Sequence, residues 1–354
     1  MGAMFGFRIR TTVFLLVAAL SLAPMVFAAD IAPILERGRT AFAAGKFDEA
    51  LKAFREAVAG DAKSAQAWYF LAIALEAKKK VAEAEKAYRE AIAIDARFAQ
   101  AHMNLGSLLV ARGKLADAEK SYRTAISANP KYAAAFFNLG VLLDRQNKDA
   151  DAVAAYRSAV RFEPRDVNTR LNLGAALRRS GDLDGSIVEA RAALSLDPKN
   201  RIAQLNLGLL LSDKGDFAGA NASLRKVVDA FPNDAGGWQA LGRVALRRKL
   251  PGEALAALRK ASTLDPRDPA IAEDRCRAEA AVDPAGAAAV SACRAAIALD
   301  VTRPMPRYML AKLQIARGEC AAAKKEMAQF LAMPGLTERA KAGASALLVT
   351  CAKK

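Results

Sequence analysis

The apolar positions of this chain recur with a period of 34 residues. Each period contains two stretches in which apolar residues stand three and four places apart, which puts them on one face of an α-helix. The pattern therefore predicts two helices per period, repeated along most of the chain. A small residue marks each first helix: Gly38, Ala72, Gly106, Gly140, Gly174, Gly208 and Gly242. Another small residue marks each second helix, twelve places later: Ala50, Ala84, Ala118, Ala152, Ser186, Ala220 and Ala254.

These two columns of small residues predict a close crossing of the two helices within each unit. Glycine inside a helix costs about 1 kcal/mol relative to alanine, so a column of glycines needs a packing reason. Leucine precedes the glycine column at Leu71, Leu105, Leu139, Leu173, Leu207 and Leu241. Large apolar residues recur on the second helix at Phe54, Tyr88, Tyr122, Tyr156, Leu224 and Leu258. Residues that tolerate the left-handed conformation separate the two helices: Gly45, Gly113, Asn147, Gly181 and Gly215.

Taken together, these columns resemble the tetratricopeptide repeat, over residues 31 to about 335. The resemblance implies an all-α fold, a right-handed superhelical α-solenoid of helix-turn-helix hairpins. We expect seven regular units over 31–268 and two irregular units over 269–335, because the register shifts by one residue after Pro266. Residues 336–354 then form a C-terminal capping helix, since the last unit of a repeat array has no neighbour to bury its face. Trp68 and Trp238 fall on the family's aromatic position and are interpreted as core residues.

The first 28 residues have the three-part pattern of a secretory signal peptide. Arg8 and Arg10 precede an uncharged apolar run, which ends in Val26-Phe27-Ala28. An uncleaved membrane anchor is the alternative, but the run of about 15 residues is shorter than the roughly 20 that a spanning helix needs. Cleavage would place the mature chain in the periplasm or another compartment outside the cytoplasm.

The composition is that of a folded chain, with 53% hydrophobic and 25% charged residues. The 53 basic and 37 acidic residues give a net charge of +16. This excess favours acidic partners or an anionic surface, but it is spread along the chain and also fits a well-solvated surface. This pattern argues against nucleic acid as a partner, since aromatic and basic residues do not interleave.

The four cysteines, Cys276, Cys293, Cys320 and Cys351, all lie in the last quarter of the chain. An oxidising compartment favours disulfides, and we expect the pairs Cys276–Cys293 and Cys320–Cys351. Four cysteines allow three pairings, between which the sequence does not choose. Four buried thiols are the other interpretation.

The sequence offers no constellation for catalysis, and we predict no enzymatic activity, cofactor or metal. P-loop, G-x-S-x-G and H-E-x-x-H motifs are absent. His102 is the only histidine and stands on the aromatic column, where we expect a packed core residue.

In the tetratricopeptide fold the first helices line a concave groove, and this resemblance singles out a ladder of asparagines. The residues two places before the glycine column are Asn104, Asn138, Asn172 and Asn206. A carboxamide offers one acceptor and two donors, so it can pair with the backbone of an extended peptide. The ladder resembles that of O-GlcNAc transferase repeats, which hold peptide backbones. Asparagine is also common at this place in repeats with no known peptide, so a structural role stays open.

An apolar series stands one place before the asparagine column. Its members are Leu35, Tyr69, Met103, Phe137, Leu171 and Leu205. If they stay partly exposed, they suit the docking of a peptide or a helix. Packing against the neighbouring repeat is the alternative.

A third set on the predicted groove is basic and follows the ladder toward the C-terminal half. Its members are Arg145, Arg178, Arg179, Arg243 and Arg247. Guanidinium groups favour a partner with acidic groups. The carboxylate clamp of chaperone-binding tetratricopeptide domains is not matched, because Leu171 and Ala175 stand where the clamp needs lysine and asparagine.

The sequence therefore predicts an exported scaffold that binds a protein or peptide segment in its groove, with envelope assembly or secretion as possible settings. The alternative is a basic protein that binds an envelope polysaccharide or an anionic surface. A steep loss of binding with rising salt would distinguish the second function from the first.

Overall fold

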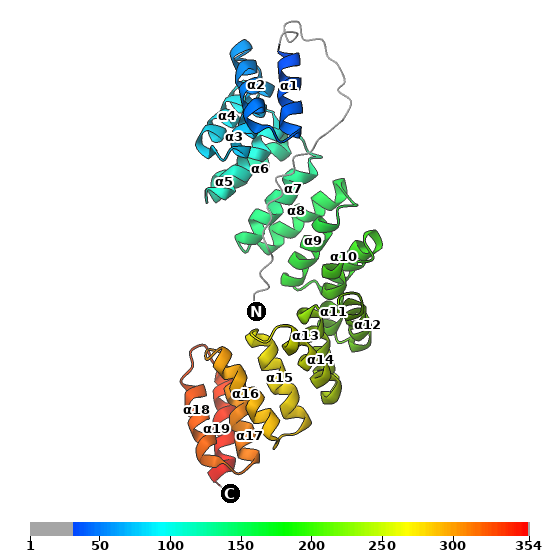
Figure 1. Cartoon of the computed structure of the whole chain (residues 1–354), viewed down its shortest axis with the longest axis vertical. Coiled ribbons are helices and arrows are strands. Elements are labelled where there is room, and N and C mark those ends of the chain that lie inside the picture. Colours follow the sequence, from blue (N-terminus) through cyan, green and yellow to red (C-terminus); the bar gives the residue numbers. More distant parts are fainter. Residues whose placement is uncertain (1–30, 353–354) are drawn as a thin grey trace. The chain divides into compact units, whose positions relative to one another are not determined.

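The computed structural model describes residues 31–352, which form nineteen α-helices and no strand within that range (Figure 1). The helices are α1 (Ala32–Ala43), α2 (Phe47–Gly60), α3 (Ala65–Ala77), α4 (Val81–Ile94), α5 (Ala99–Ala111), α6 (Leu115–Ala128), α7 (Ala133–Arg145), α8 (Asp149–Phe162), α9 (Val167–Arg179), α10 (Leu183–Leu196), α11 (Arg201–Lys214), α12 (Phe217–Ala230), α13 (Ala235–Arg247), α14 (Pro251–Leu264), α15 (Pro269–Val282), α16 (Ala287–Leu299), α17 (Pro304–Ala316), α18 (Cys320–Leu331) and α19 (Glu338–Ala352). The prediction of an all-α fold built from tandem helical hairpins is confirmed.

The described residues divide into two compact units, with the boundary between Ala176 and Leu177. In the first unit α1 to α6 pack as successive hairpins, and each new first helix also packs on the preceding second helix. The same arrangement continues in the second unit from α10 to α18, and α19 packs on α17 and α18 (Figure 1). The predicted signal segment, residues 1–28, lies outside the described residues. No helix among the described residues has the length and apolar character needed to cross a membrane.

The glycine column makes room for a large side chain of the second helix. A Cβ atom added to Gly106 would lie 2.6 Å from Cε1 of Tyr122, and one added to Gly140 would lie 2.7 Å from Cε1 of Tyr156. In each case the side chain that fills this space stands sixteen residues after the glycine. The small residues were predicted to mark a crossing between the glycine and alanine columns. The structure shows that the nearer contact is between glycine and the large apolar residue.

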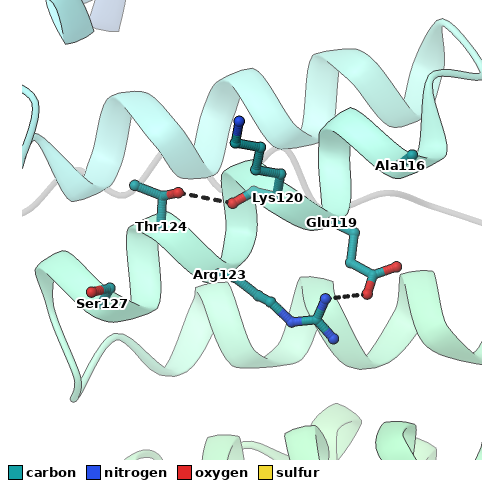
Figure 2. A pocket seen from close by; sticks show the side chains of 6 residues that line it. All are labelled: Ala116, Glu119, Lys120, Arg123, Thr124 and Ser127. Carbon is teal, nitrogen blue, oxygen red and sulfur yellow. Dashed lines mark hydrogen bonds and ion pairs between the residues drawn. The ribbon is translucent and has the colours of Figure 1, made fainter.

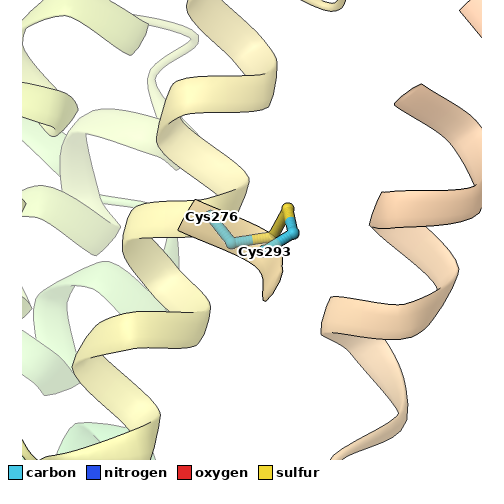
Figure 3. Close-up of a disulfide and its surroundings, with 2 residues drawn as sticks. All are labelled: Cys276 and Cys293. Carbon is cyan, nitrogen blue, oxygen red and sulfur yellow. A yellow bond between two sulfur atoms is a disulfide. The ribbon is translucent and has the colours of Figure 1, made fainter. Parts of the chain in front are cut away.

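The first irregular hairpin of the second unit, α15–α16, replaces this contact by a disulfide. In α15 the glycine column holds Cys276, which forms a disulfide with Cys293 of α16, with Cα atoms 4.7 Å apart (Figure 3). Cys293 stands in the column of large apolar residues, so the disulfide joins the two columns that elsewhere meet as glycine and aromatic ring. The second disulfide joins Cys320 of α18 to Cys351 of α19. Both pairs are those expected from the sequence, and the described residues include no free cysteine.

Candidate functional site

The asparagines of the ladder lie half-buried on the first helices, and two of them contact the preceding repeat. The Nδ2 atom of Asn104 in α5 donates to the Tyr69 hydroxyl of α3 over 3.2 Å. Asn138 in α7 lies 3.4 Å from Sδ of Met103 and 3.5 Å from Oγ of Ser107, both in α5. The predicted asparagine and apolar columns therefore touch each other across neighbouring repeats, at an offset of 35 residues.

The other two asparagines differ from this pattern. Asn172 donates to the backbone carbonyl of Asn168 in its own helix, over 2.9 Å. Asn206 makes no side-chain hydrogen bond to any described residue. In Asn104, Asn138 and Asn172 the carbonyl oxygen of the side chain accepts no hydrogen bond from the described part of the chain. Each carboxamide therefore keeps an acceptor for a ligand, while part of its donor capacity is used inside the fold.

The apolar series is only partly accessible. Leu35 is buried, and Tyr69, Met103, Phe137, Leu171 and Leu205 are half-buried. The Tyr69 ring lies 4.9 Å from the Phe98 ring, between centroids, and the Phe137 ring lies 5.9 Å from that of Tyr156. Burial raises the pKa of Tyr69 to about 12, and hydrogen bonding to Asn104 opposes this rise. Tyr69 is thus a neutral phenol at physiological pH, and the series both packs against neighbours and leaves apolar surface available.

Two carboxyl groups near the ladder were not predicted from the sequence. The buried Tyr88 hydroxyl donates to Glu76 over 2.9 Å, and the buried Tyr156 hydroxyl donates to Asp144 over 3.0 Å. Both carboxyls stand four places after the small-residue column and twelve before their tyrosine. Burial raises the pKa of Glu76, and the hydrogen bond from Tyr88 opposes this rise. The recurrence of tyrosine and acid twelve places apart was visible in the sequence and could have identified these pairs.

Three of the five predicted arginines are already engaged by carboxylates. In the second unit Asp213 of α11 lies 2.6 Å from Nη2 of Arg178 and 3.3 Å from Nη1 of Arg247. Arg247 also donates to the Ser212 carbonyl over 3.0 Å. Arg243 lies 2.8 Å from Asp274 of α15. These three arginines therefore belong to a network of ion pairs. Arg145 and Arg179 have interaction partners as well.

Asp274 is the most buried member of this network, with 1% of its side chain exposed. It accepts a hydrogen bond from Gln239 over 2.8 Å, 35 residues earlier, which is the offset found in the asparagine ladder. Arg277 in its own helix lies 3.4 Å away. Burial raises the pKa of Asp274, and the nearby Arg243 opposes this rise. Asp274 stands two places before Cys276, so it occupies the asparagine column of the eighth unit.

Asp274→Asn is expected to raise the free energy of unfolding at neutral pH relative to the wild type, and to change it little in acid. Burial holds the pKa of Asp274 above its ordinary value of 3.8, so folding favours the protonated carboxyl. The stabilisation from this group is therefore complete below the unfolded-state pKa and is lost as the pH rises through the folded-state pKa. Urea unfolding of both proteins at about pH 3 and about pH 7 measures the difference.

The usual penalty for breaking a buried ion pair does not apply here. The side chains of Arg243 and Arg277 are 32% and 43% exposed, so water can solvate them without Asp274. A variant that is less stable than the wild type at neutral pH would show that the ion pairs outweigh the cost of burial.

Another arginine column, on the second helices, was also missed. It stands one place after the position of the large apolar column in eight successive units: Arg55, Arg89, Arg123, Arg157, Arg191, Arg225, Arg259 and Arg294. Arg55 pairs with Glu83 of the next hairpin over 3.3 Å, and Arg259 pairs with Glu279 of α15 over 3.0 Å. For Arg191, Arg225 and Arg294 the described residues provide no acidic partner. Part of this column therefore connects neighbouring repeats, and part remains exposed.

The ring side chains near the start of the first helices form hydrogen bonds with carbonyl groups of the preceding loop. Trp68 donates its ring N–H to the Ala62 carbonyl over 3.0 Å, and Trp238 donates to the Pro232 carbonyl over 2.9 Å. His102 makes the same contact through Nε2 to the Ala96 carbonyl, so Nε2 carries the proton. These side chains are half-buried, whereas the sequence predicted packed core residues. Their polar tips explain the difference, since they reach loop carbonyls six residues earlier.

A shallow depression of about 540 Å³ lies along α6 of the first unit (Figure 2). Its lining residues are Ala116, Glu119, Lys120, Arg123, Thr124 and Ser127. Figure 2 shows Arg123 directed at Glu119 beside it, so part of its charge is neutralised. The depression contains none of the predicted groove residues. Among the described residues no group of three or more histidine, cysteine or acidic side chains could hold a metal ion.

The sequence model of the tetratricopeptide repeat matches five stretches of this chain, which together take in nearly all of residues 35–269. These are residues 35–101, 103–167, 150–201, 171–235 and 205–269. No curated protein sequence matches the chain.

Three solved structures show the same fold. YrrB, described as a tetratricopeptide protein with an unusual peptide-binding site, is 23% identical with a TM-score of 0.50, over 54% of this chain and 98% of that one. PilF of Pseudomonas aeruginosa is 20% identical with a TM-score of 0.51, over 58% and 94%. The C-terminal part of a repeat protein from Cytophaga hutchinsonii is 15% identical with a TM-score of 0.58, over 68% and 98%. Identities this low show the fold alone; it is the sequence match that establishes that the chain belongs to the tetratricopeptide repeat family.

Proposed function

We propose that this protein is an exported scaffold that binds a segment of another protein on the face of its first helices. The observation that carries the proposal is the asparagine column, which keeps side-chain acceptors at one-repeat spacing beside half-buried apolar residues. An extended segment presents backbone N–H groups to such acceptors whatever its sequence. Tetratricopeptide proteins bind protein or peptide partners, which supports this reading. The groove predicted from the family would be the surface that holds the segment.

Export is part of the proposal and rests on two features. Residues 1–28 have the pattern of a cleavable signal. We propose that regular units over 31–268, irregular units over 269–335 and a cap over 336–354 follow it. The two disulfides of the second unit fit an oxidising compartment such as the periplasm. A role in envelope assembly or secretion would suit this location. We propose no catalytic role, because the described residues around the ladder serve packing and hydrogen bonding.

A second candidate function is binding to an anionic surface or polysaccharide. The exposed guanidinium groups of Arg191, Arg225 and Arg294 on second helices favour it, since they have no acidic partner among the described residues. Such binding would fall steeply as ionic strength rises. Binding through asparagines and apolar residues would change little over the same range of salt.

The test is affinity capture from the native envelope fraction with the mature protein and two variants. In the first variant Asn104, Asn138, Asn172 and Asn206 are changed to alanine, and we expect loss of a specific protein partner. Alanine favours the helix, so the fold should persist, which circular dichroism would verify. In the control variant Asn221 and Asn233, away from the ladder, are changed to alanine and the partner should be kept. A partner retained by both variants would contradict the proposal and assign the ladder to packing alone.

A further inference from the structure

A basic column on the first helices of the second unit becomes visible when the register shift after Pro266 is taken into account. The residues one place after the glycine column are Arg243 in α13, Arg277 in α15 and Lys312 in α17. Three consecutive repeats therefore place a cation at the same position. The three helices are neighbours, because α15 packs against both α13 and α17. Lys312 is exposed and has no acidic partner among the described residues.

A buried carboxylate holds two of these cations in place. Asp274 contacts Arg243 over 2.8 Å and Arg277 over 3.4 Å, and Gln239 donates to it over 2.8 Å. Burial raises the pKa of Asp274, so the fold is not made more stable by keeping this group ionised at neutral pH. The buried Asp274 restricts the guanidinium groups of Arg243 and Arg277, so these groups lose less conformational entropy when a ligand binds.

Arg247 extends the same surface toward α11. It lies one helical turn after Arg243, on the same side of α13. Asp213 pairs with both Arg247 and Arg178. The side chains are partly exposed: 51% for Arg247, 28% for Asp213 and 45% for Arg178. The seven side chains named here, which are five cations together with Asp213 and Asp274, carry a net charge of +3. One of the carboxylates, Asp274, is inaccessible to solvent.

We infer that Arg243, Arg277 and Lys312 bind an extended acidic segment of a partner protein, with one carboxylate for each repeat. First helices of neighbouring repeats lie roughly 10 Å apart. A segment in the extended polyproline II conformation advances about 3.1 Å per residue with three residues per turn, so every third side chain lies on the same face and meets a new repeat. The expected ligand therefore has aspartate or glutamate at every third position. The inference rests on the proposed function, because it names the chemistry of a segment bound on the first-helix face.

A protein segment is the occupant that the spacing favours. The cations form a single row at repeat spacing, and the buried Asp274 interrupts positive charge between two of them. A membrane surface or a polysaccharide of uniform charge would gain as much from the exposed arginines of the second helices. Neutralising the first-helix cations should therefore weaken binding of a spaced acidic segment more than neutralising the second-helix arginines does. Binding of a uniformly charged surface should weaken equally in both cases.

The test measures binding of a labelled synthetic peptide by fluorescence anisotropy, with the full mature protein. The peptide has glutamate at every third position among serines and glycines. In the ladder variant Arg243, Arg277 and Lys312 are changed to glutamine. In the matched control Arg191, Arg225 and Arg294, exposed on second helices of the same unit, are changed to glutamine. Both variants lose the same net charge, so long-range attraction falls equally and only the local contacts differ.

We expect the ladder variant to bind the peptide roughly tenfold or more weakly than the wild type, and the control variant to bind within about threefold of it. A peptide of the same composition with its glutamates adjacent should bind the wild type more weakly than the spaced one. Equal losses in the two variants, or equal binding of the two peptides, would overturn the inference. Tighter binding of polygalacturonate or of anionic lipid vesicles than of the spaced peptide would overturn it too.

Folding is checked separately, because Arg243→Gln removes one partner of the buried Asp274. If the triple variant unfolds, the double variant Arg277→Gln, Lys312→Gln is compared with Arg225→Gln, Arg294→Gln under the same criteria. A failure of this inference can be distinguished from a failure of the proposed function. If the four asparagine replacements abolish partner capture while neither set of cations affects the spaced peptide, the scaffold proposal stands and this inference fails.

Discussion

Replacing Cys276 and Cys293 together by alanine is expected to lower the stability of the α15–α16 hairpin by about 3 kcal/mol. The disulfide closes a loop with a sequence separation of 17 residues, and its loss returns conformational freedom to the unfolded chain. In a repeat array each unit contacts only its neighbours, so the effect should stay close to α15 and α16. Hydrogen exchange of the backbone amides in these helices, with and without the replacements, measures the local change.

The second disulfide provides the matched comparison. Cys320→Ala with Cys351→Ala opens a loop with a sequence separation of 31 residues, and should release α19 while leaving exchange in α15 and α16 unchanged. Wild-type protein treated with a reductant should behave like the two double variants combined. Unchanged protection of α15 and α16 in the first variant would show that packing alone holds this hairpin.

Tyr156→Ala is expected to cost about 3–5 kcal/mol, the range found for large-to-small replacements of buried aromatic residues. The Tyr156 side chain is fully buried and fills the space beside Gly140, and its hydroxyl donates to Asp144. Alanine would leave a cavity beside Gly140, and the glycine has no side chain that could fill it. Urea or thermal unfolding, followed by circular dichroism, measures the loss.

Tyr156→Phe separates the two contributions. It keeps the ring beside Gly140 and removes only the hydrogen bond to Asp144, so we expect a loss of about 1 kcal/mol. A loss in the phenylalanine variant as large as that in the alanine variant would mean that the hydrogen bond, rather than the packing against Gly140, carries the stability of this hairpin.

The predicted partner chemistry changes once the contacts of the arginines are known. Arg178, Arg243 and Arg247 were predicted as a basic set facing a ligand, but Asp213 and Asp274 already engage them. The exposed positive charge lies instead at Arg277 and Lys312, which were not among the predicted groove residues. The sequence contained this signal, because Arg277 stands 34 residues after Arg243, and Lys312 stands 35 residues after Arg277, which matches the one-residue shift of the eighth unit.

The sequence by itself determined the hairpins, their period and their turns. Gly113 and Asn147 have the predicted left-handed conformation, with φ of 74° and 58°. Periodicity suffices for these features because helix faces and turns depend on residues close in sequence. The cysteine pairs are the expected ones, but the sequence left three pairings open and the structure decided between them.

Only the tertiary structure decided which columns touch. An alignment in steps of 34 shows that Asn104 and Tyr69 recur, but not that first helices of neighbouring repeats meet at an offset of 35. It also could not show that Asp274 is buried between Arg243 and Arg277, because burial and charge pairing depend on how two separate hairpins pack. The period of a repeat is a local property of the chain, whereas the partner of each polar group on its surface is fixed by the geometry between repeats.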